Sequence, residues 1–156
     1  MKAILTKAVV ALAVSTIAAF GADNTIGTWK LNVANSKYTG AAMPVKSLTV
    51  TREASDGGVK QTVTGERADG PINATYTAKY DGTEVKVTGS NLTYDTIAIK
   101  QVNANTLTDE RKKTGGPYKA TGRTVVSNGG KTMTTTTKGT AADGKEFTQI
   151  LVFEKQ

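Results

Sequence analysis

Short segments in which apolar and polar residues alternate follow one another along most of the chain. Residues 72–80 show the pattern best: isoleucine, alanine and tyrosine occupy the even positions, and asparagine, threonine and lysine occupy the odd positions. A period of two is typical of a half-buried β-strand, whose successive side chains point to opposite faces. The same alternation recurs over residues 48–50, 59–63, 85–87, 97–99 and 147–153. Counting residues 28–31 and the remaining segments between predicted turns, the pattern predicts ten strands in up-and-down order.

Turn-forming residues separate these segments at intervals of roughly a dozen residues. Asp-Gly and Asn-Gly supply the positive φ angles that two-residue hairpin turns need. Only residues 33–45 leave room for a short helical turn, which Pro44 would end. The predicted turns are Asp56-Gly57-Gly58, Asp69-Gly70-Pro71, Asp81-Gly82, Gly89-Ser90-Asn91, Asn103-Ala104-Asn105, Gly115-Gly116-Pro117, Asn128-Gly129-Gly130 and Asp143-Gly144.

The predicted meander of antiparallel strands favours a closed sheet. An open sheet of this kind would expose two edge strands, and closure is the usual way in which proteins remove them. The last segment, residues 146–154, is apolar on both faces, as expected of a strand that is covered on both sides. We therefore predict an all-β fold, an antiparallel up-and-down β-barrel of about 8–10 strands with little helix.

The first 21 residues have the pattern of a secretory signal peptide rather than of the fold. Lys2 and Lys7 are followed by an uncharged run over residues 8–20 and by the small-residue pattern of 19–21. This run of 13 residues is shorter than the ~20 that a membrane-spanning helix needs. We predict a signal peptide over 1–21 and a single barrel domain over 22–156, with cleavage after Gly21 or Ala22. The mature protein would then be periplasmic or secreted, without stable insertion in the membrane.

The composition narrows the chemistry that the chain can perform. Its 156 residues include no histidine and no cysteine, but 27 threonines and 16 glycines, which favour strands and turns. Without histidine and cysteine there is no His-based acid–base catalysis, no Ser-His or Cys-His nucleophile, no zinc site of the usual ligand types and no disulfide. Four aspartates directly precede glycine, where they stabilise turns: Asp56, Asp69, Asp81 and Asp143. We therefore predict no enzymatic activity, no metal site and no cofactor.

The net charge is too small and too dispersed for a nucleic-acid-binding protein. Removing Lys2 and Lys7 with the signal peptide lowers the net charge from +7 to +5. The densest basic cluster is Lys112, Lys113 and Lys119, which is weaker than the basic stripe expected of such a protein. We therefore expect no nucleic-acid partner.

The hexapeptide Gly27-Thr28-Trp29-Lys30-Leu31-Asn32 carries a resemblance to known proteins. A Gly-x-Trp on the first strand, a ten-strand meander and the ending Val152-Phe153-Glu154-Lys155 resemble the calycin group, which includes the lipocalins and the intracellular fatty-acid-binding proteins. Together with residues 35–38 and 131–134, the hexapeptide is most similar to uncharacterised secreted bacterial lipocalin-like proteins. The resemblance implies that Trp29 closes one end of the barrel, a structural role.

The chain also departs from these families. The Arg-x-Tyr that clamps a carboxylate on the last strand of fatty-acid-binding proteins corresponds here to Leu151 and Phe153, so that anchor is missing. Residues 33–45 are too few for their helical lid. Streptavidin-like barrels also begin with Gly-Thr-Trp but surround biotin with several tryptophans, whereas this chain has one. Biotin is therefore not the expected ligand.

Five polar residues share the phase of apolar strand positions, and we predict that they point into the barrel. Such buried groups persist only if they are hydrogen-bonded, hydrated or facing a ligand. Arg111 would anchor an acidic ligand, since a guanidinium binds carboxylates bidentately. Two alternatives stay open: a solvated barrel rim for residues 109–113, and an internal polar network around fixed waters. The five predicted ligand-binding residues are Gln61, Tyr76, Gln101, Arg111 and Gln149.

The threonine-rich segment 132–137 is predicted to be a strand, but the sequence does not decide which of its residues face inward. Threonine fits the outer face of a sheet, yet an inward Thr135 and Thr137 would give the interior a hydroxyl lining. Small residues at predicted inward positions, such as Ala74 and Gly122, would leave room for a ligand.

These observations predict a monomeric, exported protein that binds a small apolar or amphipathic molecule. The alternative is a ligand-free structural or interaction module of the cell envelope whose barrel is filled. A lumen of several hundred Å³ would favour the first, and a closed lumen the second.

Overall fold

The computed structural model describes residues 21–127 and 129–156 and shows an all-β protein. Within these residues there is no helix, and therefore none long and apolar enough to cross a membrane. The predicted signal peptide lies outside the described residues except for Gly21. The strands are β1 (Gly27–Leu31), β2 (Lys37–Gly40), β3 (Val45–Ser55), β4 (Gly58–Arg67), β5 (Gly70–Lys79), β6 (Asp81–Lys86), β7 (Thr88–Ser90), β8 (Thr96–Asn103), β9 (Thr106–Lys112), β10 (Lys119–Val126), β11 (Thr132–Thr140) and β12 (Glu146–Lys155).

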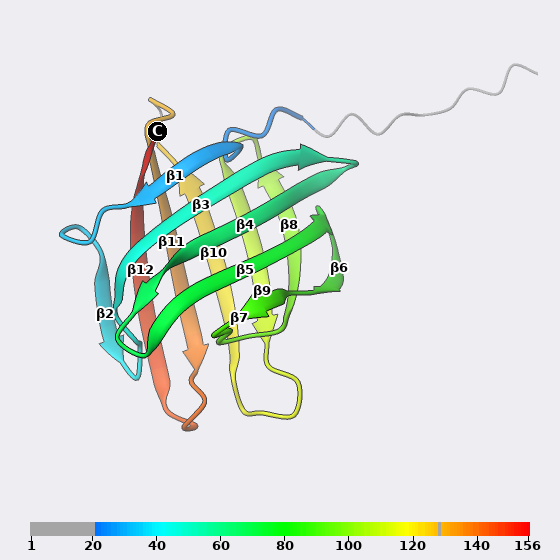
Figure 1. The fold of residues 1–156 in the computed structure, drawn as a ribbon. Helices are drawn as coiled ribbons and strands as arrows, with labels where there is room; N and C mark the ends of the chain where they lie inside the picture. The colour runs from blue at the N-terminus through cyan, green and yellow to red at the C-terminus, as the bar shows by residue number, and fades with distance from the viewer. Residues whose placement is uncertain (1–20, 128) are drawn as a thin grey trace, which may run out of the picture.

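All twelve strands belong to one antiparallel sheet that curls into a nearly closed barrel. Its order is β6-β8-β9-β10-β11-β12-β1-β3-β4-β5-β7, with β2 paired to β12. In Figure 1, β1, β3, β4 and β5 run obliquely in front of β8 to β12, so the two halves of the sheet face each other. The predicted fold class is therefore confirmed.

A short stretch of chain closes the barrel at its seam. β6 pairs with β8 at one edge of the sheet, and β7 pairs with β5 at the other. Only Val87 separates β6 from β7, so the chain passes from one edge to the other at this residue. Val87 is buried, and its amide donates to the carbonyl of Asp95. The two edges of the sheet are thus joined at this point by the covalent chain and not by a continuous ladder of hydrogen bonds.

The two strands that the sequence did not predict both have a structural reason. β2 occupies the segment 33–45, where a helical turn was expected, and pairs with the first half of β12, while β1 pairs with the last part. Without β2, the first half of β12 would expose unpaired backbone groups along that edge. β7 lies where the turn Gly89-Ser90-Asn91 was predicted, and the turn itself begins at Asn91, whose φ is 57°. Both expectations were wrong.

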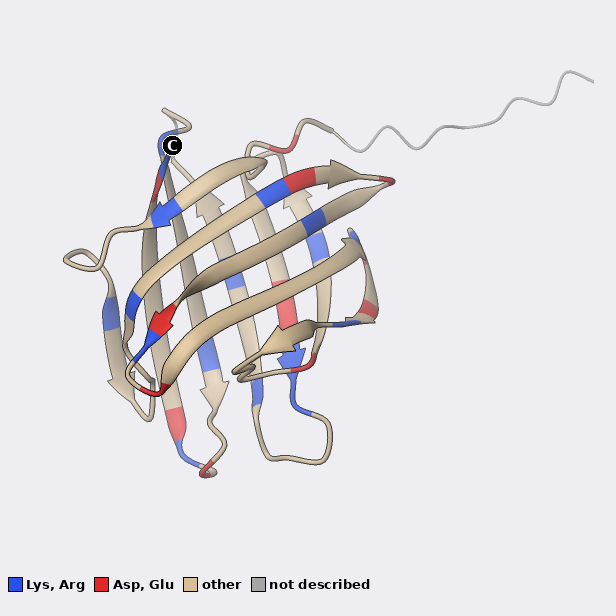
Figure 2. Ribbon diagram, in the orientation of Figure 1, with Lys and Arg blue, Asp and Glu red and all other residues tan. Residues whose placement is uncertain are grey.

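The buried core lies inside the barrel, and a second, smaller buried cluster contains Tyr118 and Phe147. The described N-terminal segment and the C-terminus lie at the upper end of the barrel in Figure 1. Trp29 and Val59 have no exposed surface, and Ile97 is 2% exposed. Figure 2 shows that lysine, arginine, aspartate and glutamate are spread over the strands and loops of both halves. Charged residues that nevertheless lie buried are Arg52, Arg67 and Asp109. All three residues line the interior of the barrel.

Candidate functional site

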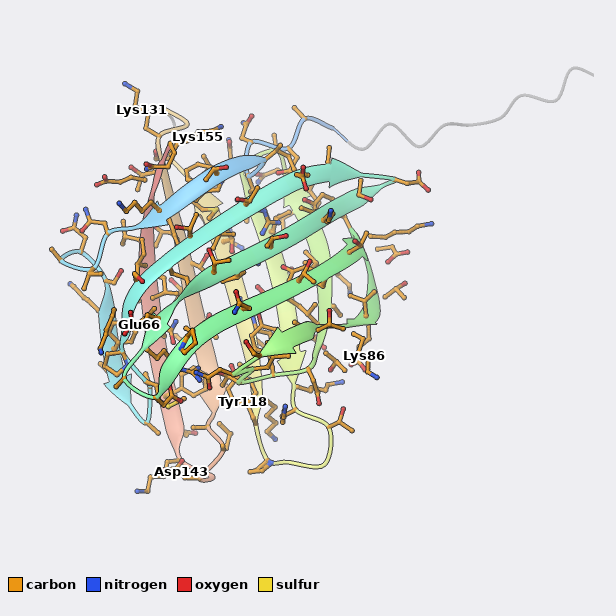
Figure 3. The ribbon with its side chains drawn as sticks, viewed as in Figure 1. Glu66, Lys86, Tyr118, Lys131, Asp143 and Lys155 are labelled. Carbon is orange, nitrogen blue, oxygen red and sulfur yellow. The ribbon has the colours of Figure 1, made fainter. Side chains whose placement is uncertain are left out.

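The barrel encloses a cavity of about 420 Å³. Its wall is formed by inward residues of the long strands, and its lower end by three loops, residues 41–43, 91–94 and 141–143. In Figure 3, Tyr118 and Asp143, which both line the cavity, lie at this lower end, and Lys155 lies at the opposite one. Met43 in the first loop is 48% exposed. The cavity therefore reaches the surface between the loops.

The upper end is sealed by Trp29 and the segment that precedes β1. The indole Nε1 donates to the backbone carbonyl of Thr25 at 2.8 Å, and Lys155 Nζ lies 5.2 Å from the centre of the ring system. Asp23 accepts hydrogen bonds from the amide and the hydroxyl of Thr25, and from the hydroxyl of Tyr80. The placement of Trp29 agrees with the structural role that the resemblance implied.

Four of the five predicted site residues line the cavity. Gln61 and Tyr76 are 8% and 5% exposed, and Arg111 and Gln149 are partly buried. Gln101 does not line it: its side-chain amide donates to the carbonyl of Ala22 at 3.3 Å, at the sealed end. Gln101 shares the inward phase of Ile97 and Ile99, but it lies farther along β8, beyond the sealed upper end of the cavity. For this residue the prediction was correct about the phase and wrong about the position along the barrel axis.

Arg111 is paired within the protein. Its Nε donates to Asp109 Oδ1 at 2.6 Å and its Nη2 to Asp109 Oδ2 at 3.2 Å, while the guanidinium carbon lies 5.2 Å from the ring centre of Tyr94. Burial lowers the pKa of Arg111, but the charge and hydrogen bonds of Asp109, together with Tyr94 and Tyr118, raise the pKa well above its usual value. The side chain of Asp109 is only 7% exposed. The internal network thus describes Arg111 better than a solvated rim, and its charge is already neutralised.

Gly122 leaves the space in which the Asp109 carboxylate lies. The two residues are directly opposite each other on β10 and β9. A Cβ at position 122 would overlap both carboxylate oxygens of Asp109. The small inward residue therefore makes room for an ion pair, not only for a ligand.

Arg52 on β3 also lines the cavity, and the sequence analysis missed it. Its Nε donates to Thr25 Oγ1 at 3.1 Å and its Nη1 to Gln61 Oε1, whereas its Nη2 is buried without a partner. The residue is 6% exposed. A signal was present in the sequence, because Arg52 continues the inward phase of Leu48 and Val50.

Aromatic side chains form the wall near the lower end. Tyr94 stacks on Tyr118 with ring centres 6.3 Å apart, and Tyr118 stacks on Phe147 at 5.8 Å. Burial raises the pKa of Tyr118 to about 12 and also raises that of Tyr94. Both phenols therefore stay protonated at neutral pH.

The threonines of β11 settle the phase that the sequence left open. Thr135 and Thr137 point inward and are 8% and 3% exposed. Thr135 lines the cavity, and its hydroxyl lies 2.9 Å from that of Thr124 on β10. The cavity wall therefore contains hydroxyl groups.

The described residues contain no group of three or more aspartates and glutamates placed to hold a metal ion. Arg67, the third arginine of the cavity wall, is also paired: it donates to Asp69 at 2.9 and 3.1 Å and to the side chains of Asn91 and Thr93. The chemical character of the cavity is thus apolar, with hydroxyl, amide and guanidinium groups, which is suited to binding.

Comparison with known proteins concerns the fold. No family model matches the sequence, and no curated protein matches it. Among solved structures, the zebrafish ileal bile acid-binding protein in complex with cholic acid is 10% identical, with a TM-score of 0.50 over 86% of this chain and 100% of that chain. The solution structure of lipocalin 12 from rat epididymis is 12% identical, with a TM-score of 0.47 over 85% of this chain and 66% of that chain. The chain has a calycin-type barrel, and the narrower resemblance to secreted bacterial proteins stays a prediction.

Proposed function

We propose that the protein binds a small amphipathic molecule inside its barrel. The observation that carries this proposal is the cavity of about 420 Å³, which reaches the surface between three loops. Small-molecule sites commonly have volumes of ~300–1,000 Å³ and combine an apolar lining with a few polar groups. The zebrafish neighbour of this fold is named for bile-acid binding and was solved with cholic acid, which supports a binding role.

The lining indicates an amphipathic rather than a purely apolar ligand. Aliphatic side chains such as Val50, Val63 and Leu151 alternate around the wall with hydroxyl and amide groups such as Thr135 and Gln149. A wholly apolar molecule would displace water from polar groups such as the Gln149 amide and offer them no partner, which costs free energy. A molecule with one polar end can satisfy some of them.

The remaining parts of the proposal rest on the sequence. The pattern of residues 1–21 supports export to the periplasm or the exterior, and the absence of histidine and cysteine supports binding without catalysis. We propose a monomer. The alternative, a structural module with a filled barrel, is less favoured because of the cavity.

Native mass spectrometry of protein purified from its own export compartment tests the proposal. A bound small molecule should co-purify with the wild type and be lost from Ala74→Phe, which places a ring in the cavity wall. Thr75→Phe makes the same substitution on the exposed outer face of β5 and should retain the molecule. Absence of any bound mass, together with no uptake of added amphiphiles by the wild type, would favour the filled structural module.

A further inference from the structure

Three side chains from neighbouring strands form a row on the inner wall of the barrel. Arg52 on β3 is directly opposite Gln61 on β4, and Gln61 is directly opposite Tyr76 on β5. Side chains at opposed positions of an antiparallel pair lie ~5 Å apart and point to the same face. All three residues are buried and line the cavity.

Each member of this row can still donate a hydrogen bond. Nη2 of Arg52 is buried and has no partner, and Nη1 already donates to Gln61 Oε1. The carbonyl oxygen of Gln61 accepts this bond, so the amide nitrogen of the same side chain points away from Arg52. No described residue accepts a hydrogen bond from this amide nitrogen. The hydroxyl of Tyr76 likewise has no hydrogen-bond partner within residues 21–127 and 129–156.

Arg52 also lacks the counter-charge that other inward arginines have. Arg67 is paired with Asp69, and Arg111 with Asp109, but no ion pair among the described residues includes Arg52. Asp23 is connected to it through two intervening hydroxyl groups: that of Thr25, which donates to Asp23 and accepts from Arg52 Nε, and that of Tyr80, which donates to Asp23 and also contacts Arg52. A buried charge without a partner is costly, so this row is incomplete as it stands.

We propose that the row of Arg52, Gln61 and Tyr76 binds the carboxylate of an acidic amphiphile. A carboxylate accepts several hydrogen bonds, and those from a guanidinium are shorter and stronger than neutral ones. The three donors lie toward the sealed end, because Arg52 contacts Thr25 beneath Trp29. The ligand therefore enters with its acid group first, and its apolar part lies between Leu107, Met133 and the aromatic wall near the loops. This inference rests on the proposed function and names its ligand class.

The burial of Tyr76 supports the assignment. Burial raises the pKa of its hydroxyl above the ordinary value, although the charge of Arg52 acts in the opposite direction. The phenol therefore remains a donor at neutral pH. The Tyr76 hydroxyl can therefore donate to a ligand without a change in its protonation state.

The test uses a matched pair of fluorescent probes, dansyl-undecanoic acid and its methyl ester, with the mature protein. The wild type should bind the acid about 10- to 100-fold more tightly than the ester, as expected for hydrogen bonds to a charged group. Arg52→Met should lower the affinity for the acid to that for the ester, with ester binding unchanged. Arg123→Met removes an exposed arginine on the outer face of β10 and should change neither affinity.

The outcomes separate this inference from the proposed function. Binding of both probes with equal affinity by the wild type, or an unchanged preference for the acid in Arg52→Met, overturns the inference and leaves the binding function intact. Binding of neither probe overturns both. If Arg52→Met does not fold, Tyr76→Phe and Gln61→Leu must each reduce the preference for the acid several-fold, and an unchanged preference in both variants overturns the inference.

Discussion

Replacing Arg111 with methionine should destabilise the protein even when no ligand is present. The guanidinium holds Asp109 through two hydrogen bonds of 2.6 and 3.2 Å, and the carboxylate is 7% exposed. Methionine keeps the apolar stem of the side chain but removes the guanidinium and leaves the Asp109 charge buried without its partner. The expected effect therefore comes from Asp109, not from the lost volume.

The magnitude follows from the burial of the pair. Removing one partner of a buried ion pair typically costs ~3–5 kcal/mol, and the partly exposed Arg111, at 17% side-chain exposure, places the expected loss near the lower end. For a domain of about 135 residues, 1 kcal/mol corresponds to ~3–4 °C in Tm, so we expect a decrease of about 10 °C. Replacing both partners, in Asp109→Leu with Arg111→Met, should restore most of this loss, because apolar replacements of a whole pair are often neutral.

Urea denaturation of the wild type, the two single variants and the double variant measures these free energies of unfolding. Arg123→Met is the matched control, since this arginine is exposed and should change the free energy by less than ~0.5 kcal/mol. An Arg111→Met protein as stable as the control, or a double variant less stable than Arg111→Met, would refute the internal pair as the role of Arg111.

Three further predictions concern stability. Trp29→Ala should cost ~3–5 kcal/mol in urea denaturation, because the fully buried indole leaves a cavity; a change within error would contradict its role in the core. Gly122→Ala should cost ~1–3 kcal/mol by displacing the Asp109 carboxylate, and the cost should disappear in an Asp109→Ala background. Burial raises the pKa values of Tyr80 and Tyr118 from 10.0 to about 12, so their contribution to stability should be constant up to about pH 9 and fall by roughly 2 kcal/mol per tyrosine as the pH rises to 12. Denaturation curves from pH 9 to about 12 that show no decline would contradict this burial.

The alternation of residue types was sufficient for the fold class and for most of the cavity wall. A period of two assigns each strand residue to a face, and it placed Gln61, Tyr76, Arg111 and Gln149 correctly on the inner one. It does not give the position along the barrel axis, and for that reason Gln101 was expected in the cavity but lies at the sealed end. Height depends on strand length and register, which the single sequence does not reveal.

The missed strands and the threonine phase have different causes. β7 has three residues with a central glycine, a composition that favours a turn and becomes a strand only through pairing with β5. β2 forms because β12 offers it an edge, which is a tertiary effect. Threonine fits both faces of a sheet, so the inward position of Thr135 is decided by Met133 and its contacts in the core, not by its own preference.

The three inward arginines differ in a way that their local sequence already contains. Residues two apart on a strand share a face, so an acid at that spacing can neutralise an inward arginine without any long-range contact. Arg111 has Asp109 at this spacing on β9, and Arg67, at the end of β4, has Asp69 two residues on in the following turn; both pairs form. The residues two away from Arg52 are Val50 and Ala54, so its counter-charge has to come from elsewhere. In the described residues the partners of Arg52 are the neutral oxygens of Thr25, Gln61 and Tyr80. The spacing of acids thus separates arginines that stabilise the barrel wall from the one that is left to receive an anion.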